Sequence, residues 1–168
     1  MPWTTPPTFT PGQVVTATDL NSYLRDNPSY LLGRPSSVIR RNNGSDYTTT
    51  STSFVDIDAT NLAITFAVSG TAVLITFAGA LRIAAATNQA DFDVTVDGVR
   101  YGLGANGLIS MNLPNASVDN LVSFSVLVTG LAAGSHTFKV QWKVSGSTLT
   151  LRATSSQNEA TFCAVEVA

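Results

Sequence analysis

Charge is scarce in this sequence. Charged residues make up 12% of its 168 residues, the lysines number only two, and the formal net charge is −2. A chain with so few cations has no basic patch to hold a phosphate backbone, so we expect no nucleic-acid partner. Serine and threonine supply the polarity instead, and threonine favours strands because its branched Cβ suits a pleated surface.

Cysteine is nearly absent too. The single Cys163 excludes an internal disulfide framework and a zinc cluster built from cysteines alone. It lies in TFCAVEV, where alternating apolar residues predict a strand. We therefore expect a buried, unreactive thiol.

No leader or membrane segment is recognisable. The opening MPWTTPPTFTPG has neither the basic region nor the apolar region of a secretory signal. The longest apolar stretch, residues 71–86, is interrupted by Thr76 and Arg82 and is rich in β-branched residues. This pattern predicts buried strands, and we expect no membrane partner.

Four prolines mark residues 1–13 as an extended arm without a core of its own. Trp3 and Phe9 are the large apolar side chains of this arm. Either the arm is disordered, or the two rings are anchors on a partner or a neighbouring copy. We favour the anchors.

A short helix is predicted to begin after the arm. Thr16 suits the N-cap position, and Asp19 lies in the first turn, near the positive end of the helix. Val15 and Leu20 have the spacing of a hydrophobic staple.

The same helix has one apolar face, formed by Leu20, Tyr23 and Leu24. Asn27 precedes Pro28, which predicts that the helix ends there. A short turn is expected to follow through Tyr30, Leu31 and Leu32. The apolar face packs either on the chain's own β domain or on another subunit.

Short strands separated by turn signals dominate the rest of the chain. They are expected at residues 53–58, 62–68, 71–77, 80–85, 91–97, 99–103, 108–113, 121–128, 136–144, 147–153 and 160–167, with residues 33–46 as a link. Phe138, Val140 and Trp142 alternate onto one face, so Trp142 is expected in the core. The sequence predicts an all-β, jelly-roll-like antiparallel β-sandwich over residues 36–168, preceded by an arm and one short helix within residues 1–35.

Few residues suggest chemistry. GLGANG at 102–107 matches a nucleotide-binding glycine pattern, but no helix is expected after it, so a simple loop is favoured. Asp91, Asp93 and Asp97 share a strand face, where solvated carboxylates are favoured over a calcium site. His136, the one histidine, suits a structural hydrogen bond better than catalysis. We expect no enzyme activity, metal or cofactor, and an active site of two carboxylates stays open as an alternative.

Two regions resemble proteins of tailed bacteriophages. Residues 12–32, GQVVTATDLNSYLRDNPSYLL, resemble an N-terminal element of their virion proteins, in which a G-x-x-[VL]-T-A-x-D-L-N pattern opens a short helix with an R-D-N tail. The match is carried by Gly12, Thr16, Ala17, Asp19, Leu20, Asn21, Arg25, Asp26 and Asn27. Residues 61–81 and 130–153, with the final FCAVEV, resemble strands of the jelly-roll heads of phage fibre and decoration proteins, which are commonly trimers.

The resemblance implies a non-enzymatic virion protein with an N-terminal attachment element and an oligomeric head. The short link favours a capsid decoration protein, head fibre or tail knob over a long fibre, assembled in a host cytoplasm. Its expected partners are itself, as a homotrimer, and other capsid or tail proteins. The expected attachment residues are Trp3, Phe9, Val15, Leu20, Tyr23, Leu24, Tyr30 and Leu31. A module that binds a host-surface glycan and a glycan-active enzyme are the alternatives.

Overall fold

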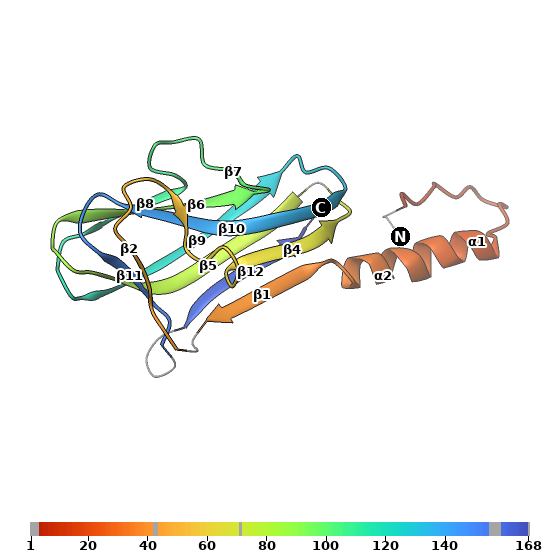
Figure 1. Ribbon diagram of the computed structural model, residues 1–168. Coiled ribbons are helices and arrows are strands. Elements are labelled where there is room, and N and C mark those ends of the chain that lie inside the picture. Colours follow the sequence, from red (N-terminus) through yellow and green to blue (C-terminus); the bar gives the residue numbers. More distant parts are fainter. Residues whose placement is uncertain (1–3, 42–43, 71, 155–158, 168) are drawn as a thin grey trace.

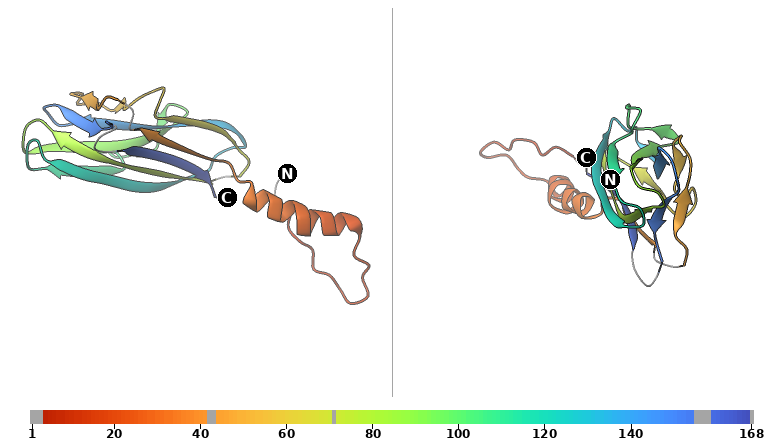
Figure 2. Two further views of the ribbon diagram at one scale, coloured as in Figure 1. Left: turned by 90° about the horizontal axis from the view of Figure 1, so that it is seen from below. Right: turned by 90° about the vertical axis from the view of Figure 1, so that its left-hand side faces the viewer.

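The computed structural model describes residues 4–41, 44–70, 72–154 and 159–167. A β-sandwich forms an elongated head, and a helix projects from one end of it with the arm folded alongside (Figures 1 and 2). The helical segments are α1 (Ala17–Leu20), the π-helical η1 (Asn21–Asp26) and α2 (Asn27–Leu32). The strands are β1 (Ser36–Arg41), β2 (Tyr47–Thr49), β3 (Val55–Asp56), β4 (Ala63–Val68), β5 (Ala72–Ile83), β6 (Asn88–Val96), β7 (Val99–Arg100), β8 (Ile109–Leu113), β9 (Asp119–Thr129), β10 (Gly134–Val144), β11 (Leu149–Arg152) and β12 (Ala160–Glu166).

Two antiparallel sheets face each other. Sheet 1 is centred on β5, which pairs with β9 along one edge and with β12 and then β11 along the other, while β1 and β2 extend it outward. Sheet 2 is centred on β10 and β6, with β3 and β4 beside β10, and β7 and β8 beside β6.

The pairing order identifies the sandwich as a jelly roll. Eight of the longer strands have the order β1-β12-β5-β9 in sheet 1 and the order β4-β10-β6-β8 in sheet 2. Numbered along the chain, these orders are 1-8-3-6 and 2-7-4-5, the arrangement of two interlocked Greek keys. The predicted all-β, jelly-roll-like sandwich is therefore confirmed.

The core lies between the sheets and belongs to the head alone. Trp142, Phe77 and Phe92 are at most 1% exposed, and the rings of Phe77 and Phe92 meet across the sheets at 6.1 Å. The buried cluster runs from Ile57 to Ala164, and no described residue of the arm or helix belongs to it. Trp142 is thus a core residue, as the alternation predicted.

Among the predicted boundaries that were wrong, two change the set of strands. The link expected at residues 33–46 contains β1. This strand pairs with β12 over six residues and forms an edge of sheet 1. The two strands expected at 71–77 and 80–85 are one strand, β5, because β9 pairs with it without a break from Ala72 to Arg82. Gly79 does not interrupt β5, since its missing side chain leaves room for Leu151.

Candidate functional site

The start of the helix follows the predicted capping. The Asp19 backbone N–H donates to Thr16 Oγ1 at 3.2 Å, and the Thr16 N–H donates to Asp19 Oδ2 at 2.9 Å. This reciprocal pair is a capping box. The hydrogen bond from the Thr16 hydroxyl to the Asp19 carboxylate lowers the pKa of Asp19. The sequence therefore specifies this helix end locally.

The predicted end of the helix at Asn27 was wrong. α1, η1 and α2 follow one another without a gap, so one helix runs from Ala17 to Leu32 straight through Pro28. A proline ring normally clashes with the carbonyl four residues earlier. Here the Asn27 N–H bonds to Ser22 O, five residues back, and this wider turn accommodates the proline.

The arm folds back along its own helix. Asn27, only 2% exposed, donates from Nδ2 to Thr4 O at 2.8 Å and accepts from the Thr4 N–H at 2.9 Å. Farther out, the Phe9 ring meets the Tyr23 ring edge-to-face at 6.4 Å. Within the described residues the arm is therefore held by the helix of its own chain. Trp3, the other predicted anchor, lies outside the described residues.

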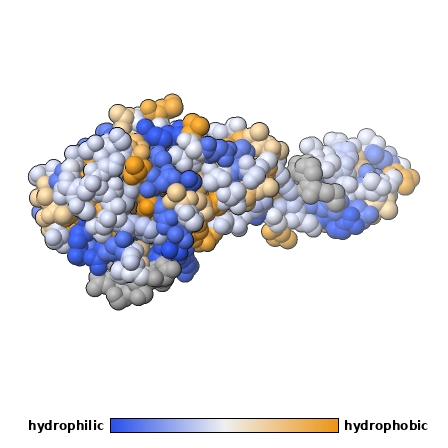
Figure 3. Space-filling model, in the orientation of Figure 1, coloured by the Kyte–Doolittle hydropathy of each residue, from blue (hydrophilic) through white to orange (hydrophobic). Residues whose placement is uncertain are grey.

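An apolar hollow opens between the arm and the helix. It has a volume of about 240 Å³ and is lined by Phe9, Val15, Asp19, Leu20, Tyr23 and Leu24. Leu24 is 71% exposed and Leu20 is 47% exposed. Figure 3 shows hydrophobic residues at the end of the arm and helix that lies farthest from the head. Five of the predicted attachment residues thus form one surface, which we call the helix hollow.

Tyr30 and Leu31 lie apart from that hollow, at the base of the helix. The Tyr30 hydroxyl is 3.4 Å from Ser69 Oγ on the head, and the Arg34 guanidinium lies over the Tyr30 ring at 5.9 Å. Arg34 also donates to Val167 O at the end of the head. Tyr30 thus belongs to the joint between helix and head, while Leu31 remains 47% exposed beside it.

The outer face of sheet 1 carries small and apolar side chains. In the register of β1, β12, β5 and β9, its central rows are Ser36, Val165, Leu74 and Leu127; Val38, Cys163, Thr76 and Ser125; and Thr161, Ala78 and Ser123. The charged side chains described on this side lie at its rim, in the ion pairs Arg40–Glu159, Arg82–Asp119 and Arg152–Asp46. We call this surface the charge-poor face.

The expected burial of Cys163 was wrong. Its neighbours Phe162 and Ala164 point into the core, so alternation along β12 turns Cys163 outward, where it is partly exposed on the charge-poor face. A seven-residue alternating pattern shows that two faces exist. It does not show which face is covered.

The outer face of sheet 2 collects charge instead. Asp93 bonds to Arg100 at 2.7 Å and accepts the Gly102 N–H at 2.9 Å. Asp91 bonds to Lys143 at 3.3 Å, and Asp97 bonds to His136 Nδ1 at 2.7 Å. The expectation that Asp91 and Asp93 are solvated was wrong, since they are 4% and 0% exposed.

Loops explain this burial. The segment 101–108 crosses the strand face, and the Phe54 ring lies over the Arg100 guanidinium at 3.9 Å. Because each of the three carboxylates has its own partner, Lys143, Arg100 or His136, they do not share one ion site. The described residues contain no group of three or more metal-ligating side chains. GLGANG is the loop itself, as predicted, with Gly102 packed on Asp93. His136 has the predicted structural role, since its Nε2 also bonds to Ala132 O at 2.8 Å.

Sequence reasoning missed three residues that position the N-terminal element. Asn27 holds the arm, Arg34 holds the joint, and Glu166 accepts hydrogen bonds from Ser69 and Gly70 beside it. Glu166 is 0% exposed. An available signal was its position as the one charged residue in the apolar strand ATFCAVEV.

Comparisons with known proteins add the following. No protein-family model matches this chain, and no curated protein sequence matches it. A structure of the Gt strain of infectious bursal disease virus is 9% identical at a TM-score of 0.49, covering 81% of this chain and 38% of that one. The T13 particle of the same virus is 13% identical at a TM-score of 0.38, covering 78% and 35%. Dimeric latent PorU from Porphyromonas gingivalis is 8% identical at a TM-score of 0.36, covering 79% and 13%.

The chain therefore spans little more than a third of the viral chains that it matches. At these identities and TM-scores the likeness does not indicate a function. The function is inferred from the chain's own residues. Within the described residues, no helix combines the length and the apolarity needed to cross a bilayer.

Proposed function

We propose that this chain is a non-enzymatic structural protein of a tailed-bacteriophage virion, a capsid decoration protein, head fibre or tail knob. The arm and helix attach it to another virion protein, and the jelly-roll head is displayed as a homotrimer. The observation that carries the proposal is a capped helix that projects from the head with its apolar side uncovered.

The helix is built to be used by a partner. A helix of this length gains most of its stability from burying an apolar face, yet the head covers none of the helix hollow. The arm contacts one side of the helix at Asn27 and Tyr23. These contacts fix the shape of the helix hollow before a partner binds. An amphipathic helix that lays exposed leucines into a groove is a recurrent mode of recognition. The resemblance of residues 12–32 to a phage attachment element supports the same assignment.

The head supplies the oligomer. The charge-poor face can be buried against sister copies with little desolvation of ions, because its charges lie at the rim. The outer face of sheet 2 is a poor candidate, since its ion pairs and loops already cover it. Trimers are proposed from the resemblance to phage heads, in keeping with the closed symmetry of most homo-oligomers.

A catalytic role is the weaker alternative. A glycan hydrolase needs two carboxylates facing a cleft. Asp91 and Asp93 are paired with the cations Lys143 and Arg100, and Asp97 is hydrogen-bonded to His136.

Attachment is tested on purified particles from the host that produces this chain. In gradient-purified particles, an antibody against the head should label the surface by electron microscopy. The double variant Leu20→Ser/Leu24→Ser should lose the label, while Leu103→Ser, at a fully exposed leucine on the head, should keep it. A chain found only outside particles would end the virion assignment.

The oligomer is tested by light scattering of the full chain. We expect about three times the chain mass of 17.6 kDa. Ser125→Lys, at the β9 end of the middle row of the charge-poor face, should give monomers, whereas Ser110→Lys, an exposed serine on β8 of sheet 2, should not. A wild-type monomer, or equal behaviour of the two variants, would contradict the proposed interface.

A further inference from the structure

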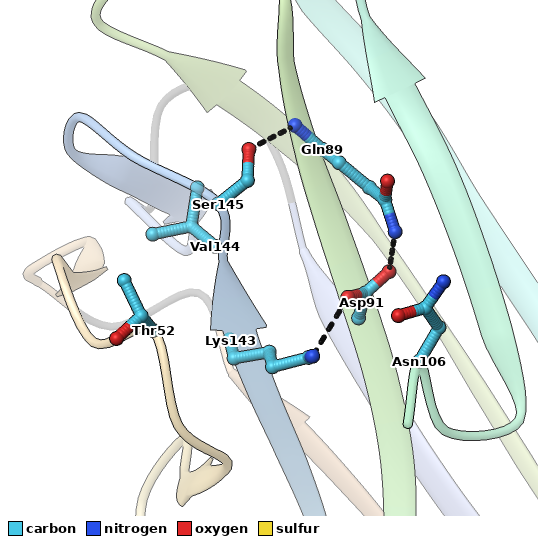
Figure 4. A pocket seen from close by; sticks show the side chains of 7 residues that line it. All are labelled: Thr52, Gln89, Asp91, Asn106, Lys143, Val144 and Ser145. Atoms are coloured by element: carbon cyan, nitrogen blue, oxygen red, sulfur yellow. Dashed lines mark hydrogen bonds and ion pairs between the residues drawn. The ribbon is translucent and has the colours of Figure 1, made fainter. Parts of the chain in front are cut away.

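A polar pocket lies at one end of the outer face of sheet 2, away from the helix hollow and from the charge-poor face. It has a volume of about 180 Å³ and is lined by Thr52, Gln89, Asp91, Asn106, Lys143, Val144 and Ser145. Figure 4 shows these side chains around the hollow, with Thr52 and Asn106 on opposite sides of Lys143. They come from β6, from the end of β10 and from three loops, so only the folded head assembles the pocket.

The floor of the pocket is rigid. Asp91 Oδ1 accepts from Gln89 Nε2 at 2.7 Å, and its Oδ2 lies 3.3 Å from Lys143 Nζ. The Lys143 ammonium also lies 5.1 Å from the centre of the Phe54 ring. The Ser145 hydroxyl is held by the Gln89 backbone N–H at 2.8 Å. These side chains are therefore in place before any ligand arrives, which lowers the entropy cost of binding.

The walls of the pocket carry side chains that can form hydrogen bonds to a ligand. Thr52 and Asn106 are exposed, and within the described residues neither side chain has a hydrogen bond. Lys143 carries three N–H donors and faces the Asp91 carboxylate with its ammonium. Hydroxyl, amide and ammonium groups from three separate segments thus converge on one space.

The charge of the pocket selects the ligand class. Lys143 and Asp91 cancel, so an anion would meet a carboxylate and a cation would meet an ammonium. A neutral molecule with many hydroxyl groups can both donate and accept hydrogen bonds here. The volume suits one sugar ring rather than a drug-sized ligand, which needs about 300 Å³ or more.

We propose that this pocket binds one neutral sugar ring of a surface glycan. Asn106, Thr52 and Lys143 contact the sugar hydroxyls, and Asp91 orients Lys143. A single open site of this kind binds weakly, with a Kd on the order of 1 mM. The proposal goes beyond the structural role, and it stands whether or not the helix attaches to a particle. Several copies in one oligomer would add avidity.

Saturation-transfer NMR on the full chain tests the site. The probes are the methyl glycosides of glucose, galactose, mannose and N-acetylglucosamine, with glucuronic acid as the charged comparison. We expect a signal from at least one neutral sugar, about fivefold weaker binding by Asn106→Ala and Thr52→Ala, and no change in Asn112→Ala or Thr65→Ala. These two controls are exposed residues of sheet 2 outside the pocket.

Three results would overturn the proposal. The first is silence from every neutral sugar, and the second is wild-type binding by Asn106→Ala. The third is tighter binding of glucuronic acid than of the neutral sugars, which would contradict the charge argument. Loss of particle attachment in the helix variants would leave the sugar signal unchanged, so the two proposals fail separately.

Discussion

The side chain of Asn27 and the main chain of Thr4 form two reciprocal hydrogen bonds across 23 residues of sequence. Asn27 is the one buried residue of the helix, whose other residues are exposed or half-buried. The amide offers Thr4 the same donor and acceptor that a neighbouring strand would, and so holds the arm to the helix without a core.

Replacing Asn27 should release the arm and spare the head. In Asn27→Ala both hydrogen bonds to Thr4 are lost, while the ring contact between Phe9 and Tyr23 in the described part of the arm remains. We expect much faster amide exchange in residues 4–13 by hydrogen-exchange mass spectrometry, with an unchanged melting temperature of the head. Asn21→Ala, an exposed asparagine of the same helix, is the matched control. Equal exchange in both variants would show that Asn27 does not hold the arm.

Glu166 should stabilise the head at its joint with the helix. Its carboxylate accepts from the Ser69 N–H at 3.1 Å, from the Ser69 hydroxyl at 2.8 Å and from the Gly70 N–H. Glu166→Gln would turn a donor toward these donors in a fully buried place. We expect a loss of about 1–3 kcal/mol in the free energy of unfolding, measured by urea denaturation.

Glu159→Gln is the control for that loss. Glu159 lies in the neighbouring segment and pairs with the largely exposed Arg40 at 3.5 Å. Its replacement should cost under about 1 kcal/mol. A loss at Glu166 no larger than at Glu159 would mean that the buried hydrogen bonds contribute little.

Gly107 and Gly98 separate steric contact from backbone strain. Both have positive φ, at 71° and 83°. A Cβ on Gly98 would meet nothing within 4 Å, whereas on Gly107 it would fall against the Phe92 carbonyl oxygen and 2.9 Å from the Phe54 ring. We expect Gly98→Ala to cost about 1–2 kcal/mol and Gly107→Ala about 3 kcal/mol or more by urea denaturation. Similar losses of unfolding free energy in the two variants would show that the 101–108 loop moves to make room for the added methyl group.

His136 should make stability depend on pH. Its hydrogen bond to Ala132 O and then its contact with Asp97 raise the pKa of His136 above 6.5. A raised pKa in the folded state means that protonation stabilises the fold. This contribution is complete below about pH 6.5 and is lost as the pH rises through the higher folded pKa.

Asp97 acts in the opposite direction. The Thr137 N–H and then His136 lower the pKa of Asp97, so its contribution is present above about pH 4 and is lost as the pH falls further. We expect a lower urea midpoint at about pH 8.5 than at about pH 6, and a smaller difference in His136→Gln. An equal difference in that variant would assign the pH effect elsewhere, because the chain has no second histidine.

Local signals predicted the features that depend on neighbours in sequence. Thr16 and Asp19 are three residues apart, so the capping box could be predicted from the spacing. The alternation in β10 placed Phe138, Val140 and Trp142 on the core face for the same reason. The break expected between the strands at 91–97 and 99–103 is local in the same way, since Asp97 and Gly98 both have positive φ in the turn between β6 and β7.

Predictions failed where an uncommon local geometry or a distant segment decides. Pro28 should have ended the helix, but a π-helical turn absorbs it. β1 was assigned to a link because its pattern SSVIRR is weak alone, and pairing with β12 makes it a strand. The attachment role of the expected residues stays a prediction; the structure brings five of them together at the helix hollow and places Tyr30 at the joint.

The residue pattern alone thus establishes an all-β head behind a capped helix, since alternation and capping act over a few residues. Folding decides which strand face is covered, and therefore buries Asp91 and Asp93 while leaving Cys163 at the surface. It also decides that the helix stands clear of the head and that Lys143, Thr52 and Asn106 share a pocket. These outcomes depend on contacts between segments far apart in the chain. A local residue pattern does not show how strong those contacts are.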